Sequence, residues 1–195
     1  MDIGVSDVRM FPWVGANYAE SGFRGRKLLI LGESEYEWTI GALQPEIATW
    51  LITANANGSK KHRFYTKIYH VFSEEPKWQS LEHFADFWQS VCFYNYIQEK
   101  VGTAPRQRPL PEMWPRWKDV FLSVVGKLNP DRILVLGKKL WSSLDDLGLV
   151  QIENDGEAWH LKSETTLIKI AYIHHPSSPC FRPASWRQIV ANLLV

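Results

Sequence analysis

Polar side chains follow several apolar segments of this chain, and their types could support acid–base and hydrogen-bonding chemistry. The carboxylates Glu33 and Glu35 follow one apolar segment, the amide Asn95 lies within another, and the imidazoles His174 and His175 follow the last. A carboxylate can activate water, and an imidazole can stabilise developing negative charge. An amide offers a donor and an acceptor, which can read the edge of a nucleobase. The set could therefore bind a polar ring such as a nucleobase.

Each motif also has a structural alternative. Glutamates are common where helices begin, because they complement the helix dipole. Asn95 could hydrogen-bond the backbone of a neighbouring loop instead of a ligand. The loop His174-His175-Pro176-Ser177-Ser178 is stiffened by proline, and such loops commonly hold a ligand or a neighbouring segment in place. The sequence alone leaves these alternatives open.

Cationic side chains, some of them beside aromatic residues, form a second pattern. Phe64 and Tyr65 lie in a basic stretch, and this mixture suits a groove that follows a phosphate backbone. A solvated helix start and loop salt bridges are the alternatives. The predicted DNA-contacting residues are Lys60, Lys61, Arg63, Arg106, Arg108, Lys138, Ser177 and Ser178.

The elements that must position these groups are read from hydrophobic patterning. Four apolar runs predict buried strands: 27–31, 91–97, 132–136 and 166–173. Helical spacing of apolar residues predicts a helix over 117–128 and a terminal helix that begins near Pro183. The fold class is therefore α/β, and we expect a three-layer α/β/α sandwich around a mainly parallel four-stranded sheet. Ligands bind such sheets at the carboxyl ends of the strands.

Composition limits the class of protein. The chain has 195 residues, 45% of them hydrophobic, and a formal net charge of +1, which predicts one domain over residues 1–195 and no general coating of nucleic acid. We expect a cytoplasmic protein, because the start of the chain has no export signal and no apolar run is long enough to cross a membrane. We also expect a monomer. Two cysteines are too few for an all-cysteine cluster. We expect no metal and no cofactor.

The motifs G-E-S-E-Y, F-Y-N-Y, L-G-K-K and H-P-S-S, in this order, resemble those of the uracil-DNA glycosylase superfamily. The resemblance implies that the loop Gly32-Glu33-Ser34 positions the attacking water and that His175 stabilises the departing base as an anion. It also implies that Asn95 hydrogen-bonds an extruded pyrimidine and that Phe64 or Tyr65 stacks on it. Ser34 and Tyr36 are the remaining predicted substrate-binding residues.

The chain departs from the family at the first motif. The aspartate of the best-studied branch is replaced by Ser34 and the proline that usually follows it by Glu35, so the catalytic carboxylate is reassigned to Glu33, with Glu35 or Glu37 as substitutes. The four cysteines of the G-E-A-P-G branch are absent. Tyr36 resembles a tyrosine that blocks bulky groups at pyrimidine C5, but its altered neighbours leave the excised base open. Uracil, a deaminated purine and a hypermodified cytosine are the candidates.

The leading hypothesis is a monofunctional DNA N-glycosylase that excises a flipped base, in DNA repair or in defence against foreign DNA. A second hypothesis is a catalytically inactive module that binds modified or single-stranded DNA, and the Ser34 replacement motivates it. A third is a nucleoside hydrolase or deoxyribosyltransferase that uses the same carboxylates. Fold analogy alone does not separate these three.

Overall fold

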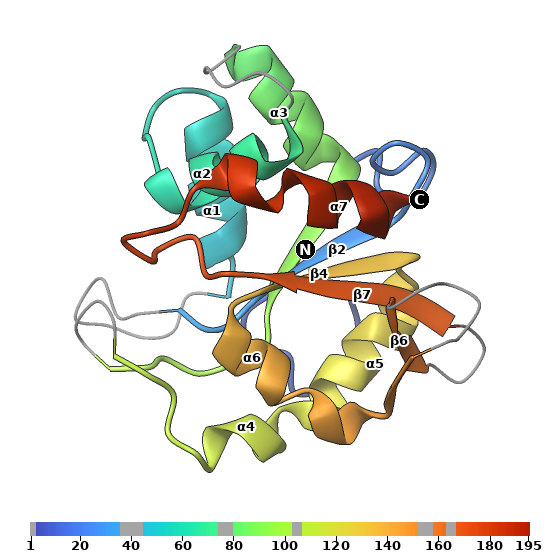
Figure 1. The fold of residues 1–195 in the computed structure, drawn as a ribbon. Coiled ribbons are helices and arrows are strands. Elements are labelled where there is room, and N and C mark those ends of the chain that lie inside the picture. The colour runs from blue at the N-terminus through green and yellow to red at the C-terminus, as the bar shows by residue number, and fades with distance from the viewer. Residues whose placement is uncertain (1–2, 36–44, 74–79, 103–106, 152–157, 163–166) are drawn as a thin grey trace.

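One mixed β-sheet runs through the protein, with helices on both of its faces (Figure 1). The computed structural model describes residues 3–35, 45–73, 80–102, 107–151, 158–162 and 167–195. In these residues seven strands lie in the order β1-β3-β2-β4-β7-β6-β5. The strands are β1 (Trp13–Val14), β2 (Leu28–Gly32), β3 (Val91–Asn95), β4 (Arg132–Leu136), β5 (Leu149–Gln151), β6 (Trp159–Lys162) and β7 (Leu167–Ile173).

The four strands predicted from sequence are the centre of this sheet. β3, β2, β4 and β7 are neighbours and run parallel, and their buried faces explain why each reads as an apolar run. The predicted number of four strands is wrong, because β1, β5 and β6 add antiparallel pairs at the two sides. These strands escaped prediction because β1 has two residues, β5 is largely exposed and β6 is exposed at both ends.

Helices cover the sheet from both sides, and alternate residues of each central strand face opposite cores. Leu28 and Ile30 of β2 pack with one set of helices, while Leu29 and Leu31 pack with the other. The first set is α1 (Ile47–Ala56), α2 (Arg63–Phe72), α3 (Leu81–Ser90) and α7 (Arg187–Leu194). The second set is α4 (Met113–Arg116), α5 (Lys118–Leu128) and α6 (Lys138–Ser142).

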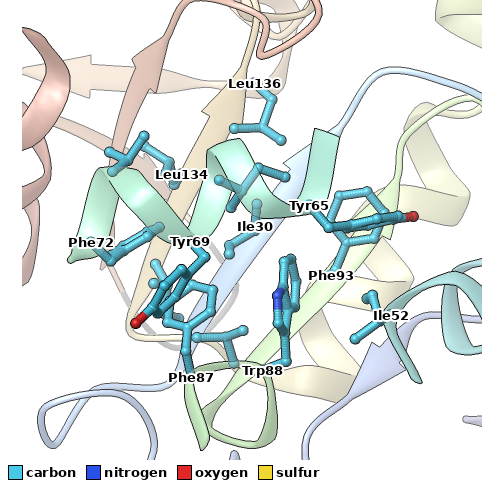
Figure 2. Close-up of a cluster of buried hydrophobic side chains, with 14 of the residues drawn as sticks. Ile30, Ile52, Tyr65, Tyr69, Phe72, Phe87, Trp88, Phe93, Leu134 and Leu136 are labelled. Atoms are coloured by element: carbon cyan, nitrogen blue, oxygen red, sulfur yellow. The ribbon is translucent and has the colours of Figure 1, made fainter. Parts of the chain in front are cut away.

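The core beneath α2 is rich in aromatic rings. Tyr65, Trp88 and Phe93 meet edge to face with ring centroids 5.4 to 6.3 Å apart, and Figure 2 shows them packed over Ile30. Edge-to-face packing brings the positive edge of one ring to the negative face of the next. This cluster fixes α2 against the sheet at the end where the predicted site residues lie.

The predicted helices are present with small shifts. The periodicity over 117–128 corresponds to α5, which ends where Asn129 adopts a left-handed conformation with φ of 45°. The terminal helix begins as a short 3₁₀ turn, η3 (Pro183–Trp186), and continues as α7. A second 3₁₀ turn, η1 (Asp145–Leu147), follows α6. No helix within the described ranges has the length and apolar character that crossing a membrane requires.

Candidate active site

The segments that follow β2 and β7 converge with the end of β3 and with α2 on a cleft of about 60 Å³. Eight of the residues predicted from sequence line it, and they come from four separate parts of the chain. These are Glu33, Ser34, Glu35, Phe64, Tyr65, Asn95, His175 and Ser177. These residues bring two carboxylates, an amide, an imidazole and two serine hydroxyls to the carboxyl ends of the parallel strands.

Backbone hydrogen bonds hold the carboxylate segment in place. The N–H groups of Tyr96 and Ile97 donate to the carbonyls of Gly32 and Glu33, each at 2.9 Å, and Val101 N–H donates to Glu35 O at 3.1 Å. Backbone hydrogen bonds thus continue past the paired ends of β2 and β3, and Glu35 forms an isolated parallel bridge with Lys100. These contacts fix the backbone that carries Glu33 and Glu35.

Asn95 lies directly beside Gly32, its register partner across β2 and β3. A Cβ at position 32 would stand 2.3 Å from Asn95 Oδ1, so only glycine leaves room for this amide. Asn95 is 7% exposed, and its side chain has no hydrogen-bond partner within the described part of the chain. Burial of an unpaired amide is costly. The loop-pinning alternative is thus not seen, and the amide is available to a ligand.

Glu33 is 4% exposed and forms an ion pair with Arg108, whose Nη1 is 3.4 Å from both carboxylate oxygens. Burial raises the pKa of Glu33, and the charge and hydrogen bonding of Arg108, with the charge of Lys139, oppose this rise. A buried carboxyl with a raised pKa suits a general base that works near neutral pH.

His175 is held as a neutral imidazole. The N–H of Ser177 donates to its Nδ1 at 3.2 Å, which leaves Nε2 as the nitrogen that carries the proton. Burial lowers the pKa of His175 to about 4, and the charges of Arg108 and Lys67 lower it further. A neutral ring whose Nε2 donates is the form suited to stabilising negative charge on a neighbouring oxygen. His174 is exposed and packs on Trp186 with ring centroids 4.6 Å apart.

Phe64 and Tyr65 have different environments. Tyr65 is 1% exposed within the aromatic core, whereas Phe64 is only partly buried. The Phe64 ring lies 5.5 Å from the His175 ring, tilted by 37°, and 6.1 Å from Phe93. Phe64 is therefore the better placed of the two to present a ring face to a ligand in the cleft.

The other predicted DNA-contacting residues lie outside the cleft lining. Lys60, Lys61, Arg63 and Lys138 are exposed, and the Lys60 ammonium lies 4.6 Å from the centroid of the Trp50 ring. Ser178 donates its N–H to His175 O at 2.9 Å and so shapes the loop. Tyr36, Glu37 and Arg106 lie outside the described residues.

The structure adds residues that sequence reasoning missed. His62 and Leu51 line the cleft, and burial, with the charge of Lys60, lowers the pKa of His62. The position of His62 in the basic, aromatic stretch was a usable signal. Lys67, one turn into α2, donates from Nζ to Pro176 O at 2.7 Å. Nothing in the sequence marked that contact.

Two further observations bear on where chemistry can occur. A larger cleft of about 720 Å³ lies by β7 and α7. Among the described residues that line it, Lys169 is the only one with a charged side chain, and none of the predicted residues is there. Within the described ranges, no three His, Cys, Asp or Glu side chains gather as a metal site would require. The predicted catalytic residues Glu33, Glu35 and His175 therefore share the small cleft and not the larger one.

Comparison with protein-family models and with curated proteins finds no match to this chain.

Proposed function

We propose that this protein is a DNA N-glycosylase that binds a base flipped out of the helix and cleaves its N-glycosidic bond. The observation that carries this proposal is the buried amide of Asn95, which has no partner in the described residues and shares one cleft with Glu33 and His175. The parallel arrangement of β3, β2, β4 and β7 is compatible with a uracil-DNA glycosylase-like fold.

Recognition of the base falls to Asn95 and Phe64. The amide offers one donor and one acceptor, which match the paired acceptor and donor on the edge of a pyrimidine. The Phe64 ring provides a face for stacking, an interaction worth about 1–3 kcal/mol per base in single-strand binding. Because the target bond cannot be reached inside the base stack, the base must leave the helix before it enters the cleft.

Bond cleavage uses the imidazole and the carboxylate. As the bond between the base nitrogen and C1′ breaks, its electron pair leaves with the base and the sugar becomes positively charged. The Nε2 proton of His175 hydrogen-bonds the oxygen of the departing base, and the Glu33 carboxylate stabilises the sugar cation. Water then forms a bond to C1′ and transfers a proton to Glu33. The products are the free base and an abasic sugar.

Cationic side chains near the cleft can bind the phosphates of the DNA backbone. Arg108 has a 69% exposed side chain beside Glu33, and Arg63 is exposed at the first turn of α2. Each can neutralise a phosphate on either side of the flipped nucleotide.

The test is base release under single-turnover conditions, detected by mass spectrometry. The substrates are DNAs that carry uracil, hypoxanthine, 5-hydroxymethylcytosine or glucosylated cytosine, together with the matching free nucleosides. E33Q and H175A should abolish release. H174A is the matched control, because His174 neighbours His175 but is exposed and packs on Trp186 outside the cleft.

Each outcome separates the hypotheses. Release from one modified DNA, lost in E33Q and H175A and kept in H174A, supports the glycosylase. Binding to modified DNA without release by the wild-type protein supports the binding module and refutes the proposal. Cleavage of free nucleosides without activity on DNA supports the nucleoside hydrolase and also refutes it.

A further inference from the structure

Helix α2 contacts the loop after β7 at two points, one turn apart. Phe64 packs on the ring of His175, and Lys67 donates from Nζ to the carbonyl of Pro176 at 2.7 Å. Residues three apart on a helix lie on the same face, so both contacts come from one side of α2. The helix that presents the stacking ring therefore also holds the loop that presents the imidazole.

The loop has internal hydrogen bonds, and Lys67 adds a support from outside it. The carbonyls of His175 and Ser178 accept from the N–H groups of Ser178 and Phe181 at 2.9 and 3.1 Å. The Pro176 carbonyl accepts from Lys67, whose side chain also approaches the Phe181 ring, with Nζ 5.7 Å from its centroid. A charge-assisted hydrogen bond of this length is about twice as strong as a neutral one.

Lys67 has no acidic partner in the described residues. Its contacts are the Pro176 carbonyl and the Phe181 ring, and the cation nearest to it in sequence on α2 is Arg63. Burial and the charge of Arg63 lower the pKa of Lys67, and the ammonium lies beside the loop without a carboxylate partner among the described residues. The charge of the ammonium opposes protonation of His175, as does the charge of Arg108.

We propose that Lys67 is a positioning residue that fixes the loop through Pro176 and so orients the His175 imidazole toward the base. This inference rests on the proposed glycosylase function for its kinetic consequence. Its structural part, the order of the loop and the protonation of His175, can be measured without any substrate.

The groups around the His175 imidazole come from several elements. Lys67 faces it from α2 and Arg108 from the segment before α4, while Glu33, Glu35 and His62 line the same cleft. Ser177 contacts Nδ1 within the loop, and Gly137 before α6 adds no charge. Arg108 also pairs with Glu33, so a substitution at Arg108 would disturb that carboxylate as well, whereas a substitution at Lys67 would not break this ion pair.

The experiment compares the full-length wild-type protein with K67M, K67R and K127M. K67M removes the charge and the hydrogen bond, whereas K67R keeps the charge and can donate. Lys127 lies in the last turn of α5, away from the cleft, and K127M is the matched control for the loss of one positive charge. NMR of ring-labelled histidine gives the pKa of His175, and hydrogen exchange reports the order of the Ser177 and Ser178 amides.

In K67M the pKa of His175 should rise, exchange at Ser177 and Ser178 should accelerate at least tenfold, and K67R should restore both. K127M should match the wild type. On a DNA that the wild type cleaves, K67M should lower the single-turnover rate about 10- to 100-fold, the loss expected for a misplaced catalytic group, with little change in DNA binding.

Two results would overturn the proposal. The first is that K67M resembles K127M in both the His175 titration and amide exchange. The second is that the loop is unchanged in K67M while DNA binding weakens and the slope of log affinity against log salt concentration falls by about one. That result would make Lys67 a phosphate contact. If the wild-type protein cleaves no DNA, the glycosylase proposal fails, and the NMR and exchange results still decide the role of Lys67 in the loop.

Discussion

Replacement of Gly32 by alanine adds one methyl group where β2 and β3 end. The new Cβ would lie 2.3 Å from Asn95 Oδ1 and 2.9 Å from Phe93 Cζ. Non-bonded heavy atoms are most stable about 3.5–4.0 Å apart, so the amide must move by about 1 Å or more, because the packed Phe93 ring yields less readily. Overpacking of this kind costs about 1–3 kcal/mol of unfolding free energy.

The same displacement takes Asn95 away from the position where it meets a base. Loss of a hydrogen-bonding partner for a buried polar group is worth about 1–3 kcal/mol, which corresponds to a fall of about 10- to 100-fold in the rate of base release. G32A should therefore lose activity and discrimination between bases while it remains folded. The stability effect is expected whichever reaction the cleft performs.

Urea unfolding measures the stability of G32A, and single-turnover base release measures its activity. G126A is the matched control, because Gly126 lies within α5 and a Cβ there would meet nothing within 4 Å. G126A should gain about 0.5–1 kcal/mol from the lower backbone entropy of the unfolded chain and keep full activity. A G32A protein as stable and as active as the wild type would refute the packing argument.

Three further predictions concern charge. Because the pKa of His175 is lowered to about 4 from 6.5, the free energy of unfolding of the wild type should fall by about 3 kcal/mol as pH decreases through this range. In urea unfolding at pH 7 and 4.5, H175Q should not show this loss, and equal losses in the two proteins would contradict the burial of a neutral ring. Because burial raises the pKa of Glu33, E33Q should be about 0.5–2 kcal/mol more stable than the wild type at pH 7, and this gain should shrink as pH falls and Glu33 of the wild type becomes protonated. If urea unfolding shows E33Q to be less stable, the ion pair with Arg108 outweighs the cost of burying the carboxylate. R63Q should lower the slope of log affinity against log salt by about 0.9 without changing the preference among bases, and an altered preference would place Arg63 at the base itself.

The centre of the fold was predictable because β2, β3 and β4 are buried on both faces and β7 is a long, mostly apolar strand. Each of β2, β3, β4 and β7 shows its burial as an apolar run, so local composition was enough to identify it. β6 has four residues, two of them buried between exposed ends, and β5 is held mainly by its pairing with β6. Short antiparallel strands of this kind depend on their partners, which composition does not reveal.

The candidate site was predictable in part for a related reason. In a parallel sheet the residues after each strand meet at one edge, so Glu33, Asn95 and His175 could be placed together from their positions alone. Contacts between distant side chains could not be foreseen. The pairing of Arg108 with Glu33 and of Lys67 with Pro176 depends on how loops cross the cleft, and no local pattern encodes that.

The strand order has a kinetic consequence. β2 pairs with β3 and β4, which are both distant from it in sequence, whereas β5, β6 and β7 are joined consecutively. Contacts between distant segments form slowly, because loop closure must precede them. The β5-β6-β7 meander can form early, but the cleft exists only after β2, β3 and β7 have all reached the sheet. Recovery of the cleft should therefore be among the last events of refolding and should report completion of the whole molecule.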